Sequence, residues 1–153
     1  MLQEIHAFQA AYARCIDDDR LEGWPDFFLE QCLYRVTTAD NHRRGMEAGL
    51  IWADSRGMLR DRISALREAN IYERHGYRHI IGLPLAEAET DGAIRAETPF
   101  LVVRTMRDGA TSVFASGRYL DLFRRDGAGM LRLAERIVVC DSSRIDTLLA
   151  IPL

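Results

Sequence analysis

Apolar residues recur at three- and four-residue spacing in two parts of the first half of the chain. The first set predicts a helix that ends at the acidic run 17–19, and its apolar face is formed by Ile5, Phe8, Ala11, Tyr12 and Ile16. The second set predicts the strongest helix of the chain, which Asp54 or Ser55 would cap, and its apolar face is formed by Met58, Leu59, Ile63, Leu66 and Ile71. Between them, segment 24–28 carries a proline and predicts a short helix with Pro25 in its first turn. Its three aromatic side chains should pack inward.

After residue 76 the pattern changes to extended segments that are rich in β-forming residues and separated by turns. Strands are predicted at 77–81, 85–90, 94–106, 111–124 and 131–141, after an earlier strand at 32–38. A polar loop at 40–45 and an apolar stretch at 48–53 follow that earlier strand. The last three strands are long and joined by short turns, so they should form an antiparallel meander. Gly117, in the middle of one of them, predicts a bulge or bend.

Helices that come first and a sheet that follows define an α+β fold, in which the helices cover one face of the sheet. One extended antiparallel sheet, strongly bent around the N-terminal helices, would give a cone with an interior cavity. The 153 residues fit a single domain over 1–153, and no repeat or linker divides the chain.

Composition narrows the classes of function. The formal net charge is -3, from 20 basic and 23 acidic residues, whereas a nucleic-acid-binding protein usually has a basic excess. No apolar run approaches the roughly 20 residues that cross a bilayer. The sequence begins without a basic segment followed by an apolar one, so secretion is not expected and the cytoplasm is the predicted location.

The cysteines and histidines offer few metal ligands at a suitable spacing. Cys15, Cys32 and Cys140 lie far apart in apolar surroundings, which predicts buried free thiols rather than disulfides or a metal site. His75 and His79 are four residues apart, but a strand is predicted there, and four residues along a strand span roughly 13 Å. We therefore expect a structural, hydrogen-bonded His79 and no metal-binding residues in this chain. No nucleophile elbow or dinucleotide-binding glycine motif is present either.

Arginines gather in and just after the second strong helix, at positions 56, 60, 62, 67, 74 and 78. This pattern is consistent with a basic helix face exposed to solvent. It is equally consistent with a surface that binds another protein, since arginine binds carboxylates with two parallel hydrogen bonds. Arg62 lies nearer the apolar side and should be partly buried in an ion pair. Both interpretations of the cluster stay open at this point.

Four segments occur in an order that resembles a known family. Trp24–Phe28, Cys32–Val36, Met58–Ile63 and Tyr77–Ile80, with a closing strand at Arg132–Arg136, are similar to the small (β) subunits of aromatic-ring-hydroxylating dioxygenases over nearly the whole chain. Among these, the chain resembles the terephthalate-type subunits, whose complexes act on carboxylated aromatic rings.

The resemblance implies a cystatin-like cone of the nuclear-transport-factor-2 type. It also implies a non-catalytic β subunit that forms a trimer and supports three large α subunits. The α subunits would carry the Rieske 2Fe-2S cluster and the mononuclear Fe(II), and this chain would bind no cofactor. The complex would cis-dihydroxylate an aromatic ring with both atoms of O2. Apolar and arginine-rich patches are then expected on the outer sheet face and at the helix ends.

A second interpretation is a self-sufficient isomerase, cyclase or dehydratase on the same cone. His79 would be the general base in the cavity, with Asp40 and Tyr34 as the further candidate residues. A carrier that uses the cone as a ligand pocket is a third interpretation, which no residue pattern favours.

Overall fold

The computed structural model describes residues 1–46, 49–69, 75–144 and 151–153. The helices are α1 (Leu2–Asp17), the 3-10 helix η1 (Leu21–Phe27), α2 (Ala39–Arg43) and α3 (Arg56–Ala69). The strands are β1 (Phe28–Thr38), β2 (Ile51–Ser55), β3 (His75–Ile81), β4 (Leu85–Ala88), β5 (Ile94–Met106), β6 (Thr111–Arg125) and β7 (Leu131–Cys140).

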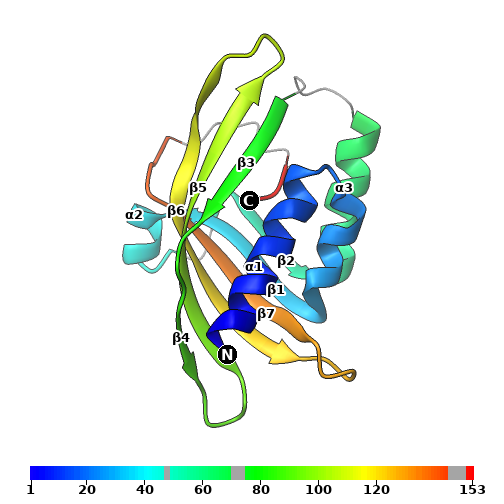
Figure 1. Cartoon of the computed structure of the whole chain (residues 1–153), viewed down its shortest axis with the longest axis vertical. Helices are drawn as coiled ribbons and strands as arrows, with labels where there is room; N and C mark the ends of the chain where they lie inside the picture. Colours follow the sequence, from blue (N-terminus) through cyan, green and yellow to red (C-terminus); the bar gives the residue numbers. More distant parts are fainter. Residues whose placement is uncertain (47–48, 70–74, 145–150) are drawn as a thin grey trace.

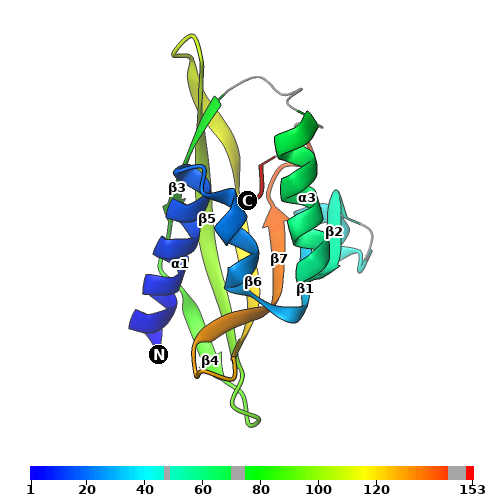
Figure 2. The same ribbon diagram turned by 90° about the vertical axis from the view of Figure 1, so that its right-hand side faces the viewer.

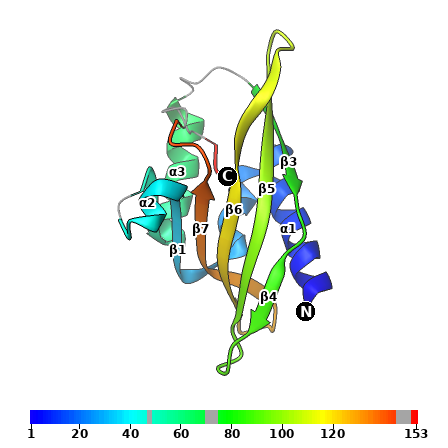
Figure 3. The same cartoon turned by 90° about the vertical axis from the view of Figure 1, so that its left-hand side faces the viewer.

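The strands form one curved sheet, and the long helices lie on one side of it (Figure 1). The strand order is β2-β1-β7-β6-β5-β3, and β4 also pairs with β5. Figure 2 shows α1 and α3 on the concave side, whereas Figure 3 shows β1, β7, β6 and β5 from the opposite side, with only the short α2 at the rim. The predicted α+β cone, with N-terminal helices packed against a bent sheet, is therefore confirmed.

One pairing differs from the predicted antiparallel sheet. β5, β6 and β7 form the expected antiparallel meander, but β1 pairs with β7 in parallel, so the sheet is mixed. The physical reason is that β1 and β7 are separated by most of the chain. No short turn joins them and forces an antiparallel arrangement.

Several element boundaries also differ from those predicted. The first strand begins at Phe28 and not at residue 32. The polar segment after it contains α2, which Thr38 caps by accepting a hydrogen bond from the backbone N–H of Asn41. Pro25 lies in the second half of η1 rather than in a first turn. Ser55 caps α3 through the N–H of Met58, and the predicted apolar position 71 lies outside the described residues.

Aromatic side chains from α1, η1 and the concave face of the sheet are among the largest fully buried side chains of the core. Trp24 and Phe28 are fully buried, as expected, and the half-buried Phe27 packs against the rings of Phe8 and Tyr12, with centroids 5.3 Å and 5.4 Å apart. The ring of Trp24 meets the rings of Phe28 and Tyr34 edge-on, with centroids 5.6 Å and 5.1 Å apart. Burying one such side chain contributes about 1.5–3 kcal/mol, so the short η1 is held in place by its aromatics. Ala11, by contrast, is exposed, and Ala13 takes the buried position on α1.

The predicted bulge at Gly117 is wrong, and the structure gives another reason for glycine there. The register of β6 shifts elsewhere, opposite Val102 and Val103 on β5 and at Leu122 and Phe123. At Gly117 the neighbouring strand comes so close that a Cβ atom would lie 2.0 Å from the backbone oxygen of Val139. Any side chain would therefore force β6 and β7 apart.

Candidate functional site

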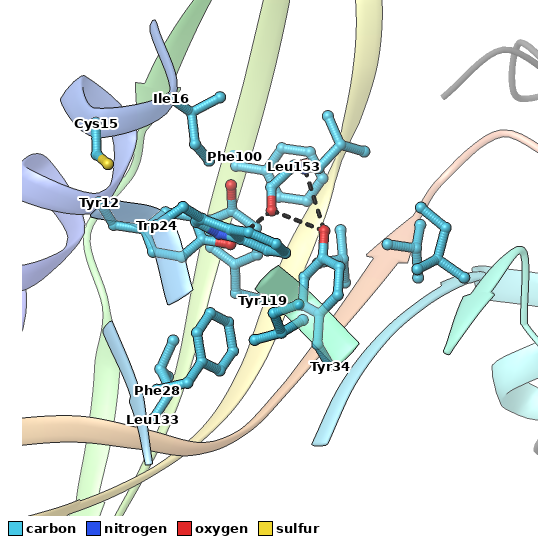
Figure 4. Close-up of a cluster of buried hydrophobic side chains, with 14 of the residues drawn as sticks. Tyr12, Cys15, Ile16, Trp24, Phe28, Tyr34, Phe100, Tyr119, Leu133 and Leu153 are labelled. Carbon is cyan, nitrogen blue, oxygen red and sulfur yellow. Dashed lines mark hydrogen bonds between the residues drawn. The ribbon is translucent and has the colours of Figure 1, made fainter. Parts of the chain in front are cut away.

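The interior of the cone is an aromatic chamber between α1, η1 and the sheet (Figure 4). Tyr12 comes from α1, Trp24 from η1 and Tyr34 from β1, while Phe100 of β5 and Tyr119 of β6 form the opposite wall. The rings of Phe100 and Tyr119 are stacked, with centroids 4.6 Å apart. These side chains pack against one another and fill the interior of the cone.

The last residue of the sequence lies inside this chamber. Leu153 is fully buried, and its backbone oxygen accepts hydrogen bonds from the hydroxyl groups of Tyr12, at 2.8 Å, and Tyr34, at 3.1 Å. Its backbone N–H donates to the hydroxyl oxygen of Tyr34. Burial raises the pKa of both tyrosines above the usual value, so both hydroxyls stay protonated and can act as donors.

A charged pair lies in the interior beside the tyrosines. Arg136 of β7 and Asp121 of β6 are both fully buried, and the guanidinium donates two hydrogen bonds of 2.8 Å to the two carboxylate oxygens. Gln9 of α1 bridges the pair, since it accepts from Arg136 at 2.5 Å and donates to Asp121 at 3.0 Å. The guanidinium carbon lies 4.1 Å from the ring centre of Tyr12 and 4.0 Å from that of Tyr119. Burial lowers the pKa of Arg136, but the Asp121 carboxylate outweighs this and raises it, so the guanidinium stays charged. No pattern in the sequence predicts this pair.

His79 forms a second buried pair, with Asp17 at the end of α1. Its Nδ1 atom lies 2.6 Å from one carboxylate oxygen, and its backbone N–H donates to the other at 2.8 Å. Because the carboxylate accepts at Nδ1, that nitrogen carries the proton, and in the neutral ring Nε2 is the basic nitrogen. Nε2 is buried without a hydrogen-bond partner. His79 is thus hydrogen-bonded, as expected, and its side chain is fully shielded from solvent.

The structure does not bring the three candidate catalytic residues together. Tyr34 on β1 binds Leu153, whereas His79 on β3 binds Asp17, and three strands separate β1 from β3 in the sheet. Asp40 lies on α2 with its side chain 47% exposed and forms ion pairs with two neighbouring arginines of that segment. Each candidate therefore has its own structural partner.

The described residues contain no cluster of three histidine, cysteine, aspartate or glutamate side chains that could hold a metal ion. The three cysteines are buried free thiols, as predicted. Burial raises the pKa of Cys32 to about 11 and that of Cys140 to about 12, so neither is a thiolate near neutral pH. Within the described parts, no helix is long and apolar enough to cross a membrane.

Two of the clustered arginines serve contacts within the chain. Arg56, at the start of α3, donates to the backbone oxygen of Phe28 and pairs with Glu30 at 2.7 Å. Arg67, in the last turn of α3, binds both Asp19 and Glu22. These two side chains fasten the ends of α3 to the rest of the fold, whereas Arg62 is half-buried.

The convex face of the sheet is the other prominent surface. Leu120 and Leu122 of β6 and Ile137 of β7 point to this side and are only partly buried. Charged side chains surround them, including an ion pair of 3.1 Å between Arg118 and Glu97. A hollow of about 470 Å3 lies over this face, lined by residues that include Leu85, Arg95, Glu97, Leu120 and Glu135. No helix of the described residues apart from the short α2 lies on this side (Figure 3).

Comparison with known proteins identifies relatives of one kind, which are small subunits of ring-hydroxylating dioxygenases. The model of the family described as "Ring hydroxylating beta subunit" matches residues 11–147. The chain is 59% identical over 150 residues to the terephthalate 1,2-dioxygenase terminal oxygenase component subunit beta 1 of Comamonas sp, covering 98% of this chain and 97% of that one. It is 39% identical to the anthranilate 1,2-dioxygenase small subunit of Burkholderia cepacia, covering 98% and 92%.

A solved structure agrees with these relatives. The β subunit assigned to an aromatic-ring-hydroxylating dioxygenase of Novosphingobium aromaticivorans superposes with a TM-score of 0.91 at 41% sequence identity, covering 99% of this chain and 96% of that one.

Proposed function

Since this chain belongs to the ring-hydroxylating β-subunit family and is a component of an aromatic-ring-hydroxylating dioxygenase, we propose that it acts there as a structural subunit. In this proposal β chains form a trimer, and the trimer supports three α subunits that carry out the oxidation. The chain works as one domain of residues 1–153, in the cytoplasm, and contributes no catalytic residue of its own.

The observation that carries the proposal is the convex face of the sheet. Its central apolar side chains, Leu120, Leu122 and Ile137, are partly exposed and form a core ringed by Arg118, Glu97 and other charged side chains. An apolar centre with a polar, arginine-containing rim is the composition of protein–protein interfaces. The face is also continuous across several strands, as a wide contact between subunits requires.

The iron centres of the complex would lie on the α subunit. A Rieske cluster needs two cysteines and two histidines, and a mononuclear iron needs two histidines and a carboxylate that face one point. The described residues do not fit either group: the three cysteines are separately buried, and His79 is held by Asp17. The chain would therefore assist the oxidation indirectly, because it would position and stabilise the α subunit.

The substrate of the complex is proposed to be a carboxylated aromatic compound. Both named relatives are subunits of enzymes for such compounds, terephthalate and anthranilate, and the first is 59% identical to this chain. The pocket that selects the substrate would belong to the α subunit.

Co-expression with the α subunit of the same dioxygenase tests this proposal. We expect a heterohexamer in size-exclusion chromatography with light scattering, and iron that stays with the α subunit when the two chains are separated. The purified β chain alone should elute without iron. A β chain that binds stoichiometric iron by itself, or an active α subunit that never associates with it, would contradict the proposal.

The alternative of an independent isomerase, cyclase or dehydratase depends on Nε2 of His79. His79→Asn removes this nitrogen, while the Asn amide can still donate to Asp17 in place of Nδ1. In the assembled dioxygenase we expect kcat per iron within about twofold of the unchanged complex, since general base catalysis typically contributes about 100- to 10,000-fold. A loss of that size, with iron content and assembly unchanged, would contradict the proposal that this chain contributes no catalytic residue.

A further inference from the structure

Two short strands at opposite margins of the sheet have an unpaired outer edge. β2 stands at one end of the strand order, and β4 pairs with β5 on one side only, so no other strand of the described residues covers either outer edge. Figure 3 shows α2, next to the β2 margin, on the left and β4 at the lower right. The free backbone groups of an edge strand are a template for contact with another chain.

Both margins expose large apolar side chains. At the β2 margin, Met46 is 48% exposed, Leu50 55% and Trp52 51%, and these three residues form what we call the β2 rim. At the other margin, Leu83 and Leu85 are each 77% exposed and form the β4 rim. Apolar side chains of this size that gather on an exposed edge mark a surface that another protein covers, and tryptophan is enriched in such contacts.

The two rims are the ends of one continuous row of side chains on the convex face. Directly paired residues on neighbouring strands point to the same side of a sheet. The row runs from the β2 rim to the β4 rim through Trp52, Arg35, Ile137, Leu120, Glu97 and Leu85. The rims are therefore continuous with the face that we propose above as the contact between subunits.

The two margins also differ in charge. Beside the β2 rim, Arg43 and Arg44 both pair with Asp40, at 3.6 Å and 3.5 Å, so two guanidinium groups share one carboxylate. At the β4 rim, Glu87 is exposed and takes part in no ion pair within the described residues. A surplus positive charge at one margin thus has a surplus negative charge at the other as its complement.

This difference between the rims matters for symmetry. A ring of identical chains joins two different surfaces of each chain at every contact, whereas a contact between identical surfaces closes a dimer. We propose that the β2 rim of one chain packs against the β4 rim of a second copy, and that three such contacts close the β trimer. This inference rests on the structural role proposed above, and it does not use the centre of the convex face.

The experiment begins with two variants that each damage one rim. Trp52→Glu affects only the β2 rim and Leu85→Glu only the β4 rim, and both side chains are exposed, so both variants should fold. By sedimentation velocity, the unchanged chain should have about three times the 17.4 kDa mass of one chain. Each variant alone should be a monomer, since a buried unpaired carboxylate weakens the contact roughly 100-fold or more.

Val113→Glu is the matched control. It introduces the same charge at a 65% exposed apolar position of β6 that belongs to neither rim, so the trimer should persist. Circular dichroism checks the fold of every variant. If Trp52→Glu or Leu85→Glu does not fold, Leu50→Glu or Leu83→Glu replaces it, because these residues lie in the same rims.

Mixing the two rim variants gives the sharpest test. The intact β4 rim of Trp52→Glu can bind the intact β2 rim of Leu85→Glu, but the two damaged rims cannot continue the ring. At increasing concentration the mixture should therefore form dimers with one copy of each variant, and no trimers. Native mass spectrometry distinguishes the two chains by their masses.

Several results would overturn the inference. These are a trimer that persists in either rim variant, self-association of one variant alone, and a mixture that associates no more than its components. A loss of α-subunit binding with the β trimer intact would assign the rims to the α subunit instead. A monomeric unchanged chain that still binds the α subunit would overturn the rim contact but not the structural role, which fails only if the α subunit does not associate.

Discussion

Replacing Asp121 by asparagine should lower the free energy of unfolding by about 3–5 kcal/mol, because it leaves the charge of Arg136 buried without a counter-charge. Both side chains are fully buried, and the guanidinium lies between the rings of Tyr12 and Tyr119, where water cannot reach it. Asparagine has nearly the same shape as aspartate, so the lost stability results from the removed negative charge and not from a cavity. Urea unfolding of the purified chain, followed by circular dichroism, measures the change.

Two comparison variants separate the buried charge from a general effect of substitution. Glu97→Gln breaks the exposed pair with Arg118, in which both side chains are more than two fifths exposed, and should cost no more than about 1 kcal/mol. Adding Arg136→Met to Asp121→Asn removes the orphaned charge and should recover part of the lost stability. If Asp121→Asn lowered the free energy of unfolding by no more than Glu97→Gln does, the buried pair would not make the expected contribution to stability.

The buried Arg136 also shows where prediction from the sequence reaches its limit. With strict alternation along β7, Leu131, Leu133 and residue 135 would face the core, and Arg136 would face outward. The structure contains a register irregularity between Leu133 and Glu135, where Leu122 pairs with Glu135 and Phe123 with Leu133. The extra residue inverts the alternation, so Arg136 joins Leu131 and Leu133 inside the cone. A bulge of this kind leaves no signal in the spacing of apolar residues.

Elements with a strong local pattern were predicted well. The apolar spacing of α1 and α3 and the turn signals between β5, β6 and β7 depend on neighbours in the sequence, and all five elements are present. The parallel pairing of β1 with β7 and the entry of Leu153 into the chamber depend instead on residues more than one hundred positions apart. No local pattern encodes such contacts, and they are the ones that close the cone.

The candidate site was only partly predictable for the same reason. The spacing argument correctly placed His79 on a strand, where it is hydrogen-bonded. It could not identify Asp17 as the partner, since the acidic run 17–19 offers three equivalent carboxylates that only tertiary packing distinguishes. The grouping of Tyr12, Tyr34 and Tyr119 in one chamber similarly required the curvature of the sheet.

On the convex face, we expect Leu120→Glu to prevent assembly of the dioxygenase while leaving the β chain folded. Leu120 is only partly buried in the separate chain, so a polar side chain there can remain solvated. In the complex the same position would be buried at the proposed contact, next to Glu97, which is directly opposite on β5. The introduced carboxylate would then lose its solvation without a partner of opposite charge, and Glu97 would add a second negative charge beside it. We expect a cost of about 3–5 kcal/mol, which lowers the affinity between the subunits roughly 100-fold or more.

Size-exclusion chromatography of the co-expressed subunits at about 1 µM protein, with activity measured in the same fractions, shows whether the hexamer forms. Met58→Glu is the matched control, because it places the same charge at a partly exposed apolar position on α3, which faces away from the convex side (Figure 2). The control should assemble normally, and the circular dichroism of both variants should match that of the unchanged chain. A stable, active hexamer with Leu120→Glu would show that the subunits meet elsewhere, since no close interface tolerates an unpaired carboxylate at its apolar centre without a large loss of affinity.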